Sequence, residues 1–159
     1  MKILIIEPFF SGSHQSWAEG YQKFSGQEVS ILSLPGRFWK WRMHGGAITL
    51  AKRYKKLKFQ PDLILATDML NLPVFQSLIQ PTCPVVIYFH ENQFTYPWSI
   101  TDEDVELQRD KHYGFINYSS ALSADHIYFN SQFHLDSFFT GLEKFLRQFP
   151  DYREIQNVE

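Results

Sequence analysis

Short runs of aliphatic residues recur along this chain, and longer segments of mixed polarity separate them. Each run is bounded by Pro, Gly or polar residues and has the length of a β-strand rather than that of a helix. A continuous aliphatic run is typical of a strand that is buried on both faces. The pattern predicts five strands, at Lys2–Glu7, Gln27–Leu34, Leu63–Thr67, Val85–Phe89 and His126–Phe129.

The segments between the predicted strands carry helix signals. Side chains that can accept a hydrogen bond from a free backbone N–H favour helix starts at Ser13, Asn71 and Ser131, and Thr101 with Asp104 makes an approximate capping box. Because glycine disfavours a helix interior, Gly45-Gly46 indicates a break before another helix. The predicted helices run from Ser13 to Phe24, Ala47 to Leu57, Asn71 to Ile79, Thr101 to Leu122 and Ser131 to Gln148.

Strands that alternate with helices predict an α/β fold with a parallel sheet and helices on both faces. We expect one Rossmann-like domain over residues 1–150, with the strand order 3-2-1-4-5. The last residues, 151–159, are polar and follow a complete β-α unit. We interpret them as a tail that leads to a neighbouring domain.

Polar residues follow the carboxyl ends of several predicted strands, where open α/β sheets bind their ligands. The first strand leads to Gly12, Ser13 and His14, the fourth to His90, Glu91, Asn92 and Gln93, and the fifth to Asn130 and Ser131. The fold is therefore expected to gather these side chains around one cleft. Each also has a structural interpretation, since Gly12 suits a turn, Ser13 a helix cap, and a strand-end histidine such as His90 a buried hydrogen bond.

Several chemistries lack their sequence signature. Gly12 alone does not make the G-x-G-x-x-G fingerprint, and no acid follows the second strand to hold a ribose, so an NAD site is not expected. The chain has six histidines but no H-E-x-x-H motif, and it has no G-x-S-x-G elbow. We expect neither a metal site nor a bound cofactor, although metal ligands converging from separate loops remain an alternative.

Charge is distributed unevenly along the chain. The net charge is −2, yet eight of the fifteen Lys and Arg residues fall between Val29 and Pro61, where there is no Asp or Glu. A basic stretch with Trp39 and Trp41 is typical of a protein that binds a phosphate-rich partner, and a solvated helix face is the alternative. The lone Cys83, the strand that begins at Lys2, and the absence of a long apolar run predict a cytoplasmic protein without a membrane anchor.

Four stretches together resemble the N-terminal domain of the tRNA-queuosine alpha-mannosyltransferase family. They are Ile3–His14 (ILIIEPFFSGSH), Leu34–Ala47 (LPGRFWKWRMHGGA), Tyr88–Pro97 (YFHENQFTYP) and Ala124–Phe139 (ADHIYFNSQFHLDSFF). The resemblance implies the N-terminal half of a retaining GT-B glycosyltransferase. Such an enzyme transfers mannose from GDP-mannose to queuosine at the wobble position of a tRNA, and it needs a C-terminal donor-binding domain for activity.

The resemblance also implies roles for individual residues. His90 and Glu91 are expected to be catalytic, with His90 facing the transferred sugar and Glu91 holding a hydroxyl of donor or acceptor. The expected substrate-binding residues are Gly12, Ser13, His14, Asn92, Gln93, Asn130 and Ser131. The basic stretch is expected to contact tRNA through Arg37, Trp39, Lys40, Trp41, Arg42, Lys52, Lys55 and Lys56. Two alternatives stay open: a non-catalytic RNA-binding module of the same fold, and a GT-B glycosyltransferase with another acceptor.

Overall fold

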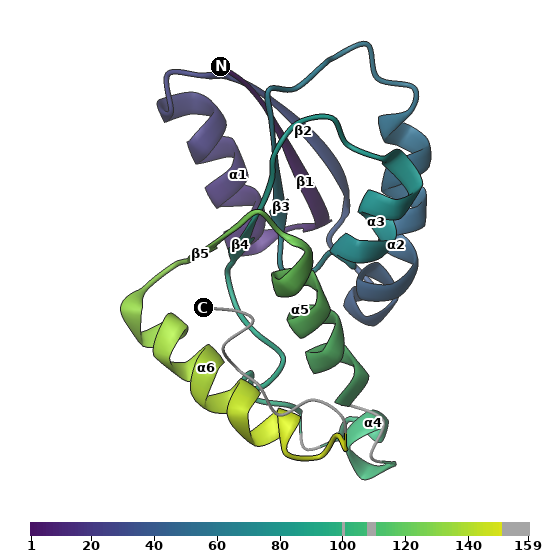
Figure 1. Ribbon diagram of the computed structural model, residues 1–159, viewed down its shortest axis with the longest axis vertical. Helices are drawn as coiled ribbons and strands as arrows, with labels where there is room; N and C mark the ends of the chain where they lie inside the picture. The colour runs from purple at the N-terminus through teal and green to yellow at the C-terminus, as the bar shows by residue number, and fades with distance from the viewer. Residues whose placement is uncertain (100, 108–110, 151–159) are drawn as a thin grey trace.

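A computed structural model describes residues 1–99, 101–107 and 111–150, and Figure 1 shows how its elements are arranged. Strands and helices alternate from the start of the chain, as the sequence predicted. The strands are β1 (Lys2–Phe10), β2 (Glu28–Pro35), β3 (Leu63–Thr67), β4 (Val85–Phe89) and β5 (His126–Phe129). The helices are α1 (Gly12–Phe24), α2 (Trp39–Tyr54), α3 (Leu72–Ile79), α4 (Glu103–Glu106), α5 (Lys111–Ser123) and α6 (Gln132–Leu146). The predicted tail, 151–159, lies outside the described residues.

The five strands form one parallel sheet, which confirms the predicted α/β class. Its order is β2-β1-β3-β4-β5, so the predicted order 3-2-1-4-5 is wrong. Both orders allow right-handed crossovers between parallel strands, and the hydrophobic pattern does not distinguish them. The consequence is that β3, rather than β4, lies beside β1, and the switch point of the sheet falls between β1 and β3.

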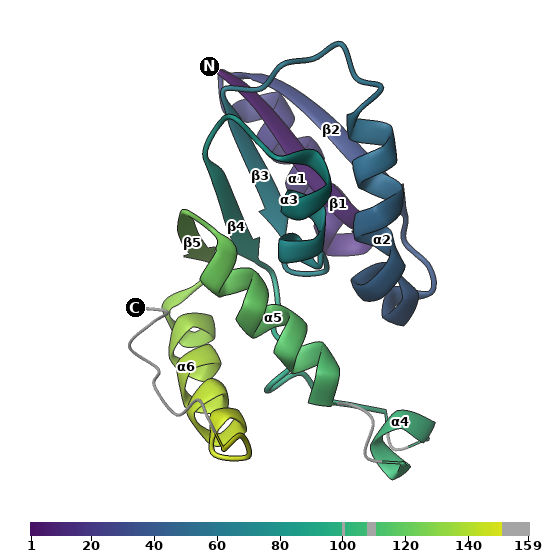
Figure 2. The same ribbon diagram turned by 45° about the vertical axis from the view of Figure 1, so that its right-hand side comes forward.

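Helices cover both faces of the sheet (Figures 1 and 2). Side chains of β1 alternate between the faces, because successive residues of a strand point in opposite directions. Ile3 and Ile5 pack on the side of α1, in a cluster with Ala18. Leu4 and Ile6 belong to the larger core cluster, which includes residues of α2, α3, α5 and α6. The sheet separates the two clusters. Their packing on both faces fixes the position of the strands, and the polar residues follow the carboxyl ends of these strands.

Helix α2 differs from its prediction because Gly45 and Gly46 lie inside it and do not break it. Both are buried, Gly45 under the ring of Trp41 in the same helix and Gly46 against β1 and β2. A Cβ on Gly46 would lie 3.5 Å from Pro8 and 3.7 Å from Leu34, and one on Gly45 would come within 2.5 Å of the Trp41 ring. These glycines therefore serve close packing, which outweighs their low helix propensity.

The helix starts agree in part with the predicted caps. Asn71 and Ser131 accept hydrogen bonds from the backbone N–H groups of Val74 and His134, as expected. Ser13 is not a cap, since α1 begins at Gly12 after Ser11 and has no side-chain cap among the described residues. The first turn of α1 therefore keeps its N–H groups available to a ligand.

The predicted helix from Thr101 to Leu122 is described as two helices, α4 and α5. Asp102 rather than Thr101 accepts the hydrogen bond from the Asp104 N–H. No helix among the described residues is long and apolar enough to span a membrane.

Candidate functional site

The carboxyl ends of β1, β3 and β4 bring together a cluster of buried and partly buried carboxyl and imidazole groups. The cluster consists of Glu7, His14, Asp68, His90 and Glu91. Three of these five residues were predicted at the site from the sequence, and Glu7 and Asp68 were missed. An acid inside an aliphatic strand and an acid directly after a strand are the signals that would have found them.

Glu7 and His14 form a buried pair at the end of β1. His14 Nδ1 lies 3.1 Å from Glu7 Oε2, and the other carboxylate oxygen accepts a 2.8 Å hydrogen bond from the Phe9 N–H. Burial alone would lower the pKa of His14, but the hydrogen bond to Glu7 and the nearby charges of Asp68 and Glu91 outweigh it and raise the pKa to about 9. The pair with Glu7 therefore favours the charged form of His14.

His90 lies against His14 at the end of β4, with ring centroids 4.1 Å apart. The rings of Trp17 and Tyr88 enclose it at centroid distances of 5.0 and 4.8 Å. Burial first, and then the charge of His14, lower the pKa of His90 to about 3. Its Nε2 is buried without a hydrogen-bond partner among the described residues. His90 is thus a neutral imidazole beside a charged one.

Asp68 comes directly after β3 and lies beneath the cluster. Its Oδ1 accepts a 2.8 Å hydrogen bond from the His90 N–H, and its own backbone carbonyl accepts one from Asn117 Nδ2 at 3.0 Å. Burial raises the pKa of Asp68 to about 8, against the opposing effects of His14 and the His90 N–H. Asp68 therefore fixes the backbone that carries His90. Burial also raises the pKa of the neighbouring Glu91.

Asn92 and Gln93 are buried, and they shape the loop after β4. Asn92 Oδ1 accepts hydrogen bonds from the backbone N–H groups of Phe94 and Thr95, both at 3.1 Å. The Gln93 N–H donates to Asn117 Oδ1 at 2.7 Å. In this arrangement the Asn92 side chain holds a turn, and its role in substrate binding stays a prediction.

Phe94 anchors the same loop between two helices. A Cβ on Gly114 of α5 would lie 3.0 Å from its ring, and one on Gly141 of α6 would lie 2.6 Å from its Cβ. Only residues without a side chain allow both helices to come so close to Phe94. The His90–Gln93 segment is therefore held at its far end by packing.

Asn130 and Ser131 lie after β5, next to His90. Asn130 Nδ2 donates a 2.8 Å hydrogen bond to the His90 carbonyl. Asn130 Oδ1 accepts from Ser131 Oγ at 3.0 Å and lies 3.1 Å from His134 Nδ1. The predicted gathering of His14, His90, Glu91 and Asn130 at one edge of the sheet is confirmed, although β3 separates β1 from β4.

Two hollows flank Glu91. One has a volume of about 270 Å³ and includes Gly12, Ser13 and His14 in its wall. The other has about 230 Å³ and includes His90, Asn130 and Ser131. Glu91 and Tyr96 line both of them. The site therefore has two compartments with a shared wall at Glu91.

The cluster has the spacing of a metal site. Ligand atoms of Glu7, His14 and His90 lie within 4.8 Å of one another, as do those of His14, Asp68 and Glu91. A metal ion would have to displace the proton that the Glu7 pair stabilises on His14. Hydrogen bonding accounts for the positions of these residues, and the absence of a metal stays a prediction.

The fold places the two parts of the basic stretch at opposite ends of α2. Arg37, Trp41 and Arg42 lie at the start of α2, whereas the Lys52–Lys56 group lies at its end, about 15–20 Å further along the axis at 1.5 Å per residue. Trp39 lines the first hollow and contacts Trp98 and Tyr113. The start of α2 therefore adjoins the site and its end does not.

Individual side chains of the stretch differ in their availability. Trp41 is 63% exposed, and Phe38 is 72% exposed with a left-handed backbone at φ 58°. Lys40 pairs with Asp102 and Asp104 at 2.6 and 2.5 Å, which outweighs its partial burial and raises its pKa to about 12. Arg37, Lys52, Lys55 and Lys56 are exposed. Phe38 is an exposed aromatic residue that the sequence analysis did not single out.

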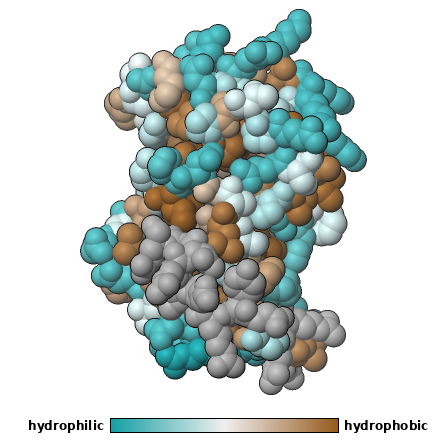
Figure 3. All heavy atoms as spheres, viewed as in Figure 1, coloured by the Kyte–Doolittle hydropathy of each residue, from teal (hydrophilic) through white to brown (hydrophobic). Residues whose placement is uncertain are grey.

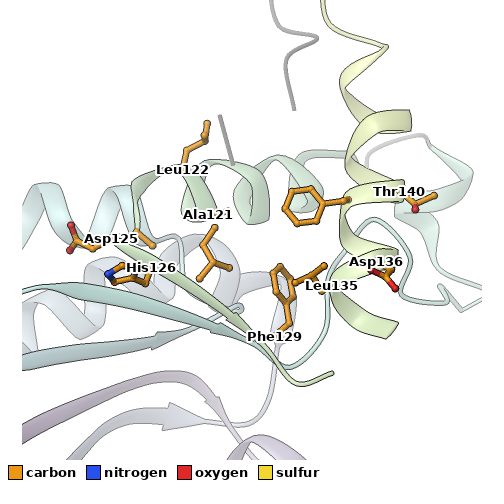
Figure 4. A pocket seen from close by; sticks show the side chains of 11 residues that line it. Ala121, Leu122, Asp125, His126, Phe129, Leu135, Asp136 and Thr140 are labelled. Carbon is orange, nitrogen blue, oxygen red and sulfur yellow. The ribbon is translucent and has the colours of Figure 1, made fainter. Parts of the chain in front are cut away.

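A larger hollow of about 820 Å³ lies between α5, β5 and α6 (Figure 4). Its wall includes Ala121, Phe129 and Leu135, and the view of Figure 3 shows apolar residues gathered over the region of β5. None of the predicted site residues lines it. The cluster residues His14, His90 and Glu91 line the two smaller hollows and not this larger one.

The fold and the cluster define a Rossmann-like domain with a polar site at the carboxyl ends of its strands. The sequence profile of the family described as tRNA-queuosine alpha-mannosyltransferase N-terminal matches residues 2–159, and the chain belongs to this family. A similar relative is the tRNA-queuosine alpha-mannosyltransferase of Drosophila melanogaster, which is 35% identical over 154 residues. The alignment covers 95% of this chain and 39% of that relative, so the chain spans well under half the length of the relative.

Proposed function

We propose that the full-length protein containing this chain transfers mannose from GDP-mannose to queuosine in a tRNA, and that this domain forms the acceptor side of the cleft. The observation that carries the proposal is the His14–His90–Glu91 cluster, at the ligand-binding edge of a domain that belongs to the queuosine mannosyltransferase family. The relative's name supplies the sugar and the acceptor. A second domain would supply most of the contacts to the nucleotide.

His14 is suited to the leaving group. In the transfer, the bond between the anomeric carbon and the diphosphate oxygen breaks, and the acceptor hydroxyl oxygen bonds to that carbon. The hydroxyl proton leaves with the released GDP. A charged His14 and the free N–H groups at the start of α1, around Gly12 and Ser13, stabilise the negative charge that develops on the diphosphate.

His90 and Glu91 are suited to the sugar and the acceptor hydroxyl. Because His90 is neutral, it can hydrogen-bond a sugar hydroxyl without repelling an oxocarbenium-like transition state. Glu91 lies between the two hollows, where a donor in one would meet an acceptor in the other. Its raised pKa makes the Glu91 carboxylate a better acceptor for a hydrogen bond from the acceptor hydroxyl, whose proton then passes to the leaving diphosphate.

The tRNA would lie along α2. Arg37, Trp41 and Arg42 lie close in the chain to Trp39, which lines the first hollow, and the Lys52–Lys56 group extends the positive charge to the other end of the helix. Cationic side chains hold the phosphate backbone, and exposed aromatic rings stack on unpaired bases. A tRNA is large enough to contact both ends of this helix while its anticodon reaches the cleft.

The test is nucleoside mass spectrometry on queuosine-containing tRNA after incubation with the full-length protein and GDP-mannose. The expected result is a hexose added to queuosine, with no addition to tRNA that carries guanosine at the same position. Other nucleotide sugars, offered in parallel, identify the donor. If tRNA is bound but no sugar is added from any donor, the proposal is wrong and the RNA-binding module replaces it.

A further inference from the structure

We propose that the 230 Å³ hollow beside His90 is the subsite for a planar nucleobase that is turned out of a single-stranded RNA loop. Its wall comes from two segments, the loop after β4 and the start of α6. It is smaller than the roughly 300–1,000 Å³ of sites that hold drug-sized ligands. The size suits one base rather than a whole nucleotide sugar.

Two exposed aromatic rings line this hollow. Phe133, the second residue of α6, is 82% exposed, and Tyr96, in the loop after β4, is 49% exposed. Single exposed apolar side chains are common on protein surfaces, but these two belong to one concave surface. Proteins that read unpaired RNA bases stack them on such rings. A base placed here would cover apolar surface that is otherwise exposed to water.

The rest of the wall is rigid. Asn130 Nδ2 donates a hydrogen bond to the His90 carbonyl, which links the two segments of the wall. Ser131 caps α6 by accepting a hydrogen bond from the His134 N–H, and His134 is 6% exposed. Thr95 Oγ1 donates to Asn92 Oδ1 at 3.2 Å. Asn130, Ser131 and Thr95 already bond within the protein, which leaves Nε2 of His90 and Nε2 of His134 as buried polar atoms of the wall without a partner among the described residues, beside a surface that is mainly apolar. Stacking, rather than hydrogen bonding, would therefore provide most of the affinity.

The hollow lies where a bound base would be next to the groups proposed to react. This part of the proposal rests on the proposed function. Glu91 and Tyr96 also line the hollow that contains His14. A base held beside Phe133 would direct its substituent across Glu91 toward the donor sugar. The first hollow would then serve the diphosphate of the donor, and the second would hold the acceptor base, with the transferred sugar between them against His90 and Glu91.

The test is a double-substitution cycle with the full-length protein and an anticodon stem-loop RNA, read out as direct binding. One substitution is Phe133→Ala, and the other is an abasic nucleotide at the wobble position. Each alone should weaken binding about tenfold, the effect of removing one base stacked on an aromatic ring. Together they should weaken it no further than either alone, because both remove the same interaction. Phe133→Trp should retain the affinity.

Phe24→Ala is the matched control, since Phe24 is 77% exposed at the end of α1 and lines neither hollow. It should bind like the unmodified protein. Independent, additive effects of Phe133→Ala and the abasic nucleotide, or no effect of Phe133→Ala, would overturn the assignment. Because binding is measured without sugar transfer, a coupled pair in a protein that transfers no sugar supports the base subsite and contradicts only the proposed reaction.

Discussion

The imidazole rings of His14 and His90 lie 4.1 Å apart, although the strands that lead to them are separated by β3 in the sheet. Their surroundings shift the two pKa values in opposite directions. His14 is held as a cation by Glu7, and His90 is held neutral by burial and by the charge of His14. A pair of this kind places a cation for an anionic leaving group beside an uncharged hydrogen-bonding group.

Replacement of His90 by Ala in the full-length protein should lower the rate of sugar transfer about 10- to 100-fold, since it removes one hydrogen bond to the reacting sugar. The measurement is turnover at saturating tRNA and nucleotide sugar, with circular dichroism to verify the fold. His126→Ala is the control, because His126 is exposed on β5 and outside the cluster. Turnover within twofold of the unmodified enzyme would remove His90 from the site.

The charge of His14 should be visible in the pH dependence of stability. Its pKa rises from 6.5 in the unfolded chain to about 9 in the folded one, so its contribution is complete below pH 6.5 and is lost as the pH rises to about 9. Asp68, with its pKa raised to about 8, acts in the same direction. Between pH 6.5 and 9.5 the chain should lose about 5–10 °C of Tm more than its His14→Gln variant does.

The comparison of these two melting profiles by circular dichroism checks the assignment. Glu28→Gln, on the exposed first residue of β2, is a control that should leave the profile unchanged. Parallel profiles for the unmodified chain and the His14→Gln variant would show that His14 is not protonated in the folded state at neutral pH.

The packing of Phe94 predicts a stability effect at Gly141. A Cβ there would meet the Phe94 Cβ at 2.6 Å, closer than real contacts allow, so Gly141→Ala should destabilise the chain by about 1–3 kcal/mol. Chemical denaturation measures the difference. Gly20→Ala in α1 is the control, since nothing lies within 4 Å of its added Cβ, and it should be neutral or stabilising. Equal stability of both variants would contradict the described position of the loop.

The end of α2 should contribute to tRNA affinity through charge. Changing Lys52, Lys55 and Lys56 together to Gln should weaken tRNA binding and reduce the slope of log K against log salt by about 2–3, one unit for each phosphate that is no longer neutralised. Salt titrations of the full-length protein measure the slope. The control is a variant with Lys2, Lys23 and Lys144 changed to Gln, which has the same net charge but is changed on other elements of the fold. If both variants behave alike, the Lys52–Lys56 group is ordinary surface.

Metal removal should leave sugar transfer intact. The cluster can act through hydrogen bonds and the charge of His14, without an ion bound to Glu7 or Asp68. Activity of the full-length enzyme should therefore stay within twofold after dialysis against EDTA, and elemental analysis should show less than one metal per chain. Loss of activity that Zn²⁺ or Mn²⁺ restores would establish a metal site at these residues.

Local sequence signals predicted the elements well where neighbours in the chain decide the structure. The short apolar segments at Leu63–Thr67, Val85–Phe89 and His126–Phe129 form the predicted strands, and Asn71 and Ser131 cap helices as expected. The start of α2 was missed because Gly45 and Gly46 suggest a break when judged by propensity alone. Their contacts with Trp41, Pro8 and Leu34 exist only in the folded chain.

The sequence by itself determined the α/β class, the edge of the sheet that carries the polar residues, and the family, since these follow from the order of strands and helices and from continuous motifs. Only the tertiary structure decided the strand order and the charge states of His14 and His90. The physical reason is that a pKa depends on burial and on charges close in space. Glu7, Asp68 and Glu91 are far apart along the chain and meet only when β1, β3 and β4 pair.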